Sequence, residues 1–213
     1  IEILTGLTPP DEGQNELHVW LEDGAGSKDH NNRKSVWALC DATVPSTGYS
    51  FDPSLPPAGW YSGTVTVNLT PQDQDGLSGI KETRWRRSGG LWNVGASFSA
   101  DSYQPYDFYS VDNAGNIEAT QTVTVPIDLT APVSTISVSP AEPPGGWYSQ
   151  TVTVAINATD DLSGWAGESW YRVGGSGAFS SGATATIATS GVHMFEYYAR
   201  DRAGNIEATH MVT

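Results

Sequence analysis

Aspartates recur at two kinds of position in this sequence, and both suit metal chemistry. Pairs stand in the loops QDQDGLSG and TDDLSG, which follow alternating apolar runs, and single aspartates end two later aromatic-rich runs. The residues are Asp73, Asp75, Asp112, Asp160, Asp161 and Asp201. If these loops meet at one pole of a domain, three carboxylates and nearby carbonyl oxygens suit a hard cation such as Ca²⁺. The sequence therefore predicts Ca²⁺ as the candidate cofactor.

The same aspartates also have a simpler interpretation. Asp and Asn side chains bond nearby backbone N–H groups, and Gly adopts the left-handed conformation of tight turns. The two loops lack the ligand spacing of an EF-hand. On sequence alone, a metal ligand and a turn former therefore both stay open.

Tryptophan and asparagine side chains offer two kinds of carbohydrate contact. Trp165 and Trp170 are not explained by the alternation of core residues, so they are candidates for stacking on the sugar rings of a polysaccharide. Asn68-Leu-Thr and Asn157-Ala-Thr match the acceptor pattern for N-glycosylation, although Pro71 directly follows the first. These residues predict either a bound polysaccharide or an attached glycan.

No catalytic constellation stands out, so the sequence predicts a protein that is not an enzyme. The histidines occupy outward strand positions or a loop, with no HExxH pair and no nucleophile elbow. They are His18, His30, His193 and His210. The single cysteine, Cys40, has no thiol-protease context and allows no internal disulfide.

An internal repeat must position all of these residues. VDNAGNIEAT at residues 111–120 returns as RDRAGNIEAT at residues 200–209. GWYS, TVTV and the boundary phrases DATVP and DLTAP return at an offset of 87, whereas LSG and DxAGN return at 85 and 89. Length changes of this size belong in loops. The repeat predicts tail strands of a preceding or partial repeat at 1–40 and two domains, at 41–127 and 128–213.

Each repeat has the pattern of a β-sandwich, because short alternating runs lie between Gly and Pro turns. Residues 63–69 alternate apolar and polar side chains, as a half-buried strand does. Trp85 and Tyr171 then stand where an immunoglobulin-type sandwich places its central core aromatic. The predicted fold class is all-β, with two complete tandem immunoglobulin-like sandwiches preceded by the C-terminal strands of another repeat.

Composition limits the partners and the setting. The net charge is −14, from 24 acidic and 10 basic residues, and no Lys/Arg cluster is available to displace phosphate counterions. We therefore expect no nucleic-acid partner. There is no apolar run of about 18 residues, so we expect no membrane insertion by this segment. Acidic, Thr/Ser-rich sandwiches with one cysteine fit a secreted or cell-surface protein, which predicts an extracellular location.

Four motifs in fixed order resemble bacterial immunoglobulin-like extracellular repeats. They are GWY, LSG (DLSG in the second copy), a strand aromatic followed by Arg, and DxAGNIE, and they occur twice within residues 41–213. The chain departs from that family at Trp85, where Tyr is usual, and at Ser27, which replaces the Asn of AGN. The resemblance implies a β-sandwich module that serves as a spacer or adhesion element along a large secreted or cell-surface protein.

These observations together predict a structural protein whose repeats form a stalk, spacer or filament. Its expected partners are neighbouring copies of itself or adjoining domains of a longer chain. Residues 1–40 could join a neighbouring copy by strand addition, because strand edges accept further strands. The alternative is a carbohydrate-binding accessory module of a secreted hydrolase.

Overall fold

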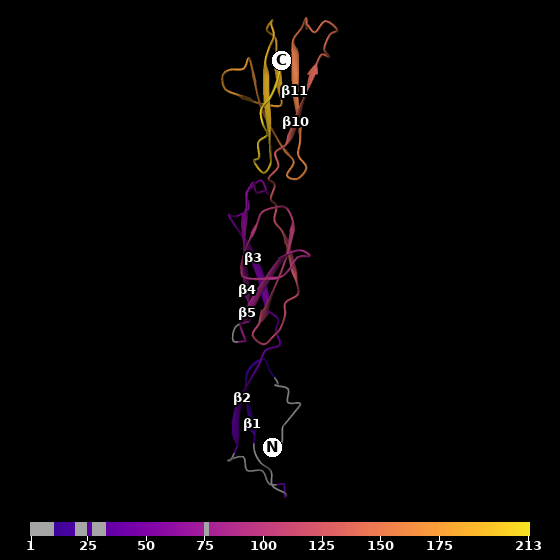
Figure 1. The fold of residues 1–213 in the computed structure, drawn as a ribbon. Helices are drawn as coiled ribbons and strands as arrows, with labels where there is room; N and C mark the ends of the chain where they lie inside the picture. The colour runs from indigo at the N-terminus through magenta and orange to yellow at the C-terminus, as the bar shows by residue number, and fades with distance from the viewer. Residues whose placement is uncertain (1–10, 20–24, 27–32, 75–76) are drawn as a thin grey trace. The chain divides into compact units, whose positions relative to one another are not determined.

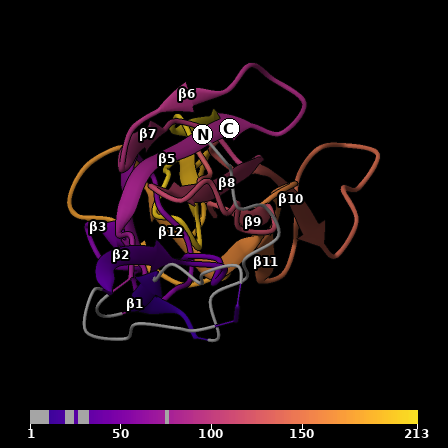
Figure 2. The same cartoon turned by 90° about the horizontal axis from the view of Figure 1, so that it is seen from below.

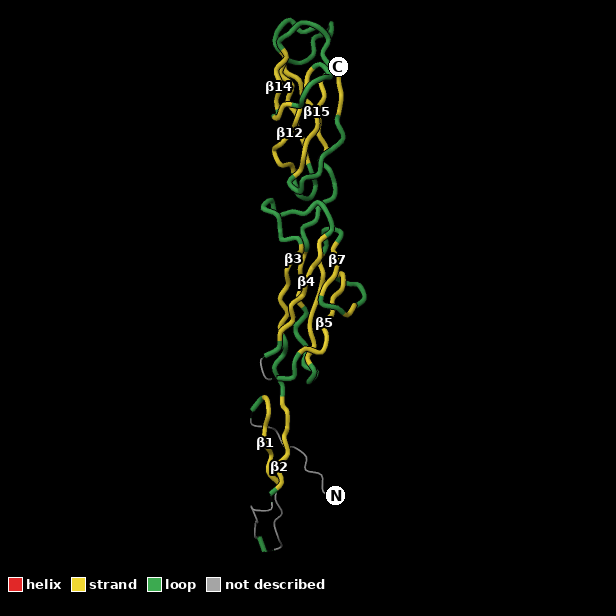
Figure 3. Tube along the Cα trace, turned by 90° about the vertical axis from the view of Figure 1, so that its left-hand side faces the viewer, coloured by secondary structure: helices red, strands yellow, loops and turns green. Residues whose placement is uncertain are grey.

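The computed structural model describes residues 11–19, 25–26, 33–74 and 77–213. In this part of the chain every regular element is a β-strand, and no helix is present (Figures 1 and 3). The paired strands are antiparallel. This confirms the predicted all-β class.

The chain packs as two compact units. The described residues of the first fall within Ile1–Ser50, Val67–Phe98 and Pro105–Val123, and the second comprises Phe51–Thr66, Ser99–Gln104 and Thr124–Thr213. Most of strands β1 to β9 lies in the first unit, and strands β10 to β16 lie in the second.

The first unit contains two larger sheets. One has the order β3-β4-β7, formed by β3 (Ser46–Asp52), β4 (Val65–Gln72) and β7 (Ser97–Ala100). The other has the order β6-β5-β8-β9, with β6 at the edge beside β5 (Figure 2). Its strands are β5 (Ile80–Arg87), β6 (Asn93–Val94), β8 (Pro105–Asp112) and β9 (Gln121–Thr124).

These two sheets pack face to face because their strands alternate apolar and polar side chains. In β4, Val67 is fully buried whereas Thr66 is exposed. Phe98 of β7 stacks on Tyr106 of β8 with ring centroids 4.7 Å apart, and Trp85 of β5 stacks on Phe98 at 4.6 Å. Fully burying one such side chain contributes on the order of 1.5–3 kcal/mol. The central aromatic, Trp85, is therefore half-buried and packs against the core of a β-sandwich.

The second unit repeats this arrangement of strands. One sheet has the order β10-β11-β14, and the other has the order β13-β12-β15-β16. The strands are β10 (Val133–Ser139), β11 (Val152–Thr159), β12 (Trp165–Val173), β13 (Ser180–Ser181), β14 (Thr184–Ile187), β15 (Phe195–Asp201) and β16 (His210–Val212). The buried core consists of Val152, Val154, Ile156, Ala185, Phe195 and Tyr197.

A two-stranded sheet precedes both sandwiches. Its strands are β1 (Gly13–Val19) and β2 (Lys34–Cys40), which pair antiparallel with Leu17 opposite Val36. Among the described residues, no third strand pairs with this hairpin.

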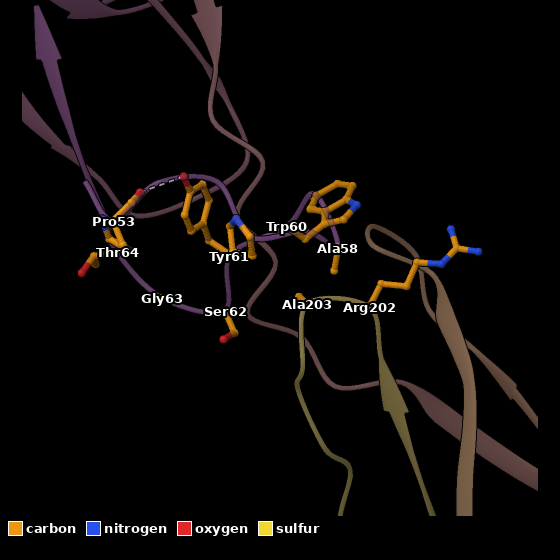
Figure 4. A pocket seen from close by; sticks show the side chains of 10 residues that line it. Pro53, Ala58, Trp60, Tyr61, Ser62, Gly63, Thr64, Arg202 and Ala203 are labelled. Carbon is orange, nitrogen blue, oxygen red and sulfur yellow. Dashed lines mark hydrogen bonds between the residues drawn. The ribbon is translucent and has the colours of Figure 1, made fainter. Parts of the chain in front are cut away.

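The tyrosine of the first GWYS motif closes the loop between β3 and β4. Tyr61 is 4% exposed, and its hydroxyl donates a hydrogen bond of 2.9 Å to the carbonyl oxygen of Pro53 (Figure 4). Its backbone N–H donates to the carbonyl oxygen of Pro126, and Tyr61 pairs with Ile127 as an isolated parallel bridge. The motif therefore has a structural role.

The glutamate of each AGNIE motif joins the first strand of its sandwich to the penultimate strand. Glu118 is 8% exposed and accepts hydrogen bonds from the N–H and hydroxyl of Thr47 in β3 and from the N–H of Ser110 in β8. Glu207 accepts the equivalent bond from the N–H of Ser134 in β10. A buried carboxylate is tolerated because several donors replace its water shell.

The two units differ in one buried hydroxyl network. In the first, Ser110 Oγ lies 2.7 Å from Thr47 Oγ1 and 2.9 Å from Thr83 Oγ1. In the second, Ala199 stands at the place of Ser110 and Ser169 at the place of Thr83. Ser169 Oγ is consequently buried without a hydrogen-bond partner. An unsatisfied buried hydroxyl costs about 1–3 kcal/mol.

We therefore expect Ser169→Ala to stabilise the second unit by about 1 kcal/mol, because it removes the unpaired group without enlarging the side chain. Equilibrium unfolding in urea measures the change. The matched variant Ser110→Ala should destabilise the first unit by about 1–3 kcal/mol, since it leaves the buried Thr83 hydroxyl without its partner, whereas Thr47 keeps its bond to Glu118. Equal losses of stability in both variants would contradict this account.

Candidate metal centres

Three aspartates from distant segments meet in the first unit. Asp41 lies between β2 and β3, Asp73 directly follows β4, and Asp112 is the last residue of β8. Each offers a carboxylate oxygen within 4.8 Å of the others. Strand ends bring them together because β4 and β8 belong to the two facing sheets.

The second unit contains the same cluster. Asp128 precedes β10, Asp160 directly follows β11, and Asp201 is the last residue of β15. Their carboxylate oxygens also lie within 4.8 Å of one another. The sequence offsets between corresponding residues are 87, 87 and 89, so the repeated phrases of the sequence place two equivalent clusters.

The DxAGN turn is wrapped around the carboxylate that ends the penultimate strand. Oδ1 of Asp112 accepts hydrogen bonds from the N–H groups of Gly115 and Asn116 at 2.7 and 2.8 Å, and Oδ2 accepts from Asn116 Nδ2 at 2.7 Å. Gly115 has φ of +98°, a conformation that L side chains rarely adopt. Asp201 makes the same three contacts with Gly204 and Asn205.

The boundary aspartate joins this turn to the LSG loop. Asp41 accepts a hydrogen bond of 3.0 Å from the N–H of Ser78, and the carbonyl oxygen of Asp41 accepts one of 3.1 Å from Asn116 Nδ2. In the second unit Asp128 accepts 2.9 Å from the N–H of Ser163. In each unit the repeated boundary, LSG and AGN phrases therefore meet in one hydrogen-bonded cluster. We call this cluster the aspartate knot; its aspartates are Asp41, Asp73 and Asp112 in the first unit and Asp128, Asp160 and Asp201 in the second.

Hydrogen bonds keep two of these carboxylates ionised. Burial alone raises the pKa of Asp112, but donors from Asn116 and the neighbouring backbone outweigh it and lower that pKa. Burial likewise raises the pKa of Asp128, and bonds from Thr130 and Ser163 overcome this and lower it to about 2. Both carboxylates are therefore negatively charged at neutral pH.

The charge of each knot suits a divalent cation. Among the described residues, no Lys or Arg forms an ion pair with any of the six clustered aspartates. Each carboxylate has about four lone-pair positions, of which backbone donors use only some. Three carboxylates with free lone pairs provide the oxygen ligands that Ca²⁺ takes.

Four of the six predicted metal ligands lie in the clusters. These are Asp73, Asp112, Asp160 and Asp201. Asp161 is exposed and outside its cluster, and Asp75 lies outside the described residues. Sequence reasoning missed Asp41 and Asp128. The available signal is the repetition of DATVP and DLTAP, which by itself indicates only a domain boundary.

The two tryptophans considered for carbohydrate binding are half-buried and contact protein groups. Trp165 Nε1 donates a hydrogen bond of 3.1 Å to the carbonyl oxygen of Glu168. The ring of Trp170 stacks on Tyr198 with centroids 5.2 Å apart, and the guanidinium carbon of Arg200 lies 5.3 Å from its centroid. Part of the ring surface that a sugar would use is thus in contact already. Carbohydrate binding stays a prediction.

The two predicted glycosylation residues lie within strands, on the outer face of a sheet. Asn68 in β4 is half-buried. Asn157 in β11 is exposed, and its side-chain nitrogen donates to Ser137 Oγ at 3.4 Å. Glycosylation also stays a prediction.

One serine and one histidine lie close together on the hairpin. His18 Nδ1 is 3.0 Å from Ser35 Oγ, and His18 Nε2 is 3.7 Å from a carboxylate oxygen of Glu16. Acyl transfer also requires preorganised donors for the oxyanion and exclusion of water. These three residues lie on an exposed two-stranded sheet, so their geometry does not support a catalytic site.

A scan of protein-family models finds no match to this chain, and a search of curated proteins finds none either. Within the described residues, no helix has the length and apolarity needed to cross a bilayer.

The lowered pKa of Asp128 predicts a loss of stability in acid. A folded-state pKa below the ordinary value contributes stability that is present above about pH 4 and lost as the pH falls towards about 2. Asp128→Asn should therefore be less stable than the parent chain near neutral pH, and the difference should shrink on acidification. Urea unfolding at several pH values measures it. A difference that stays constant down to about pH 2 would rule out this role for the ionised carboxylate.

Proposed function

We propose that this chain is a non-catalytic extracellular structural protein whose immunoglobulin-like repeats form a stalk, spacer or filament element. The observation that carries the proposal is the duplicated aspartate knot. In both units, the clustered aspartates hold three chain segments together by accepting hydrogen bonds from backbone N–H groups. Their placement at strand ends and at the start of each repeat fits a module built to be joined to another.

The outer sheet faces give the proposal further support. Arg86 forms an ion pair of 2.9 Å with Asp107, and its guanidinium carbon lies 4.3 Å from the ring centroid of Trp92. Arg172 pairs likewise with Glu196, whose pKa is lowered by the hydrogen bond from Arg172. Arg86 and Arg172 are thus each paired with a carboxylate on the sheet surface.

We include in this proposal a structural Ca²⁺ ion in each knot. Asp41 and Asp128 begin the phrases that lead into β3 and β10, so an ion there would fasten the entry of each repeat to its own sandwich. It would also offset the repulsion of three neighbouring carboxylates. The residues that would hold it are Asp41, Asp73 and Asp112, and in the second unit Asp128, Asp160 and Asp201.

The proposed partners are neighbouring copies of the chain or adjoining domains of a longer one. Within the described ranges no further strand pairs with the hairpin of β1 and β2, and unpaired strand edges accept addition of another strand. A carbohydrate-binding accessory module has less support, because the rings of Trp170 and Trp92 already contact arginine side chains.

Force spectroscopy of the single chain tests the array and the ion in one experiment. Pulled by its ends in a chelator, the chain should unfold in two separate events, because each sandwich has its own core. Each event should release about 300 Å of chain, from about 87 residues at roughly 3.4 Å each. Adding Ca²⁺ should raise the force of both events, since a ligand that binds only the folded state stabilises it.

The double variant Asp41→Asn/Asp128→Asn should lose the response to Ca²⁺, whereas Asp161→Asn, a neighbouring aspartate outside the cluster, should keep it. Unfolding in one step would overturn the array. Two events that Ca²⁺ leaves unchanged would overturn the ion and leave the array intact.

A further inference from the structure

The hairpin of β1 and β2 has the same strand register as the last two strands of the second sandwich. Leu17 lies opposite Val36 in the hairpin, and Phe195 lies opposite Val212 between β15 and β16. Leu17 corresponds to Tyr106 at an offset of 89, and 89 further on to Phe195. The hairpin therefore corresponds to the closing strand pair of a sandwich.

The hairpin differs from its counterpart in the first unit by the exposure of its apolar face. Val19 and Val36 are 42% and 56% exposed, whereas the equivalent residues Phe108 and Val123 are 0% and 4% exposed. Cys40 lies on the same face and is half-buried, in the place where Ile127 is 1% exposed. This face matches a core surface that no strand among the described residues covers.

The first unit indicates what a cover must contain. Tyr106, the equivalent of Leu17, is covered by Phe98 from the facing sheet, and Tyr49 of that sheet meets Phe108 with centroids 5.9 Å apart. The other edge of β8 pairs with β5 along its length. A complete cover therefore supplies both a facing sheet and one strand beside β1.

A second hairpin cannot provide this. Two hairpins packed face to face leave the edge of β1 unpaired, and a hairpin added beside β1 leaves the face of Leu17 and Val36 uncovered.

We propose that the hairpin docks the front strands of one more copy of this repeat, a β-segment equivalent to β3 through β7, which completes a further sandwich. The inference rests on the proposed function in treating the chain as part of an array, and it identifies the class of partner. The partner pairs one strand with β1 and covers Leu17, Val19 and Val36 with apolar side chains of a facing sheet.

The reactivity of the single cysteine tests the proposal. A second copy of residues 46–100, joined by a flexible linker ahead of the intact chain, supplies the proposed segment. Modification of Cys40 by a thiol reagent should then slow by about 100-fold or more, because a thiol inside a folded core reacts only after local opening. A control graft carries Val67→Asp in its own copy of β4, and this charged side chain prevents the graft from packing into a core. With this control graft, Cys40 should stay as reactive as in the parent chain.

Other outcomes overturn the proposal. If the graft leaves the rate unchanged while the two unfolding events under force persist, docking fails and the array stands. If the parent chain alone protects Cys40 as its concentration rises, the occupant is a second copy rather than front strands. Leu17→Asp in the grafted chain should restore the fast rate, and continued protection there would assign the effect to something other than this face.

Discussion

The structure depends on carboxylates that accept hydrogen bonds from the backbone of other segments. Each aspartate knot joins the entry to the sandwich, the loop after its first core strand and the turn after its penultimate strand. A buried carboxylate requires such donors, because burying a charge without hydrogen-bond partners carries a large free-energy cost. The three segments are thereby constrained together, which positions the surrounding strands.

The two units keep this arrangement while other polar groups vary. The buried glutamate of AGNIE is retained in both, whereas the hydroxyl network beside it is complete in the first unit and broken at Ser169 in the second. The buried carboxylate that ties the first strand to the penultimate strand thus recurs, whereas the hydroxyl network that joins Thr47, Thr83 and Ser110 does not. The same arrangement of three charges accounts for the proposal of a Ca²⁺ ion at the start of each repeat.

Most of the fold could be predicted because alternation and turn residues are local signals. The two-residue period at residues 63–69 predicts strand β4, which the structure places at Val65–Gln72, and Trp85 packs against the core on the expected side of β5. The knots could be predicted only in part, because Asp41 is brought to Asp112 by tertiary packing that no local pattern encodes. The contacts of Trp170 were missed for the same reason, since Tyr198 and Arg200 belong to another strand.

The central claim is that each aspartate knot holds the chain segments of its own sandwich together. Native-state amide hydrogen exchange at Ser78 and Ser163 tests it most directly, because their N–H groups donate to Asp41 and Asp128. The account predicts that the Ser78 amide exchanges as slowly as the core strand amides around Val67, and the Ser163 amide as slowly as those around Val154, since each requires unfolding of its own unit. Fast exchange at both loop amides, with the core still protected, would contradict the account.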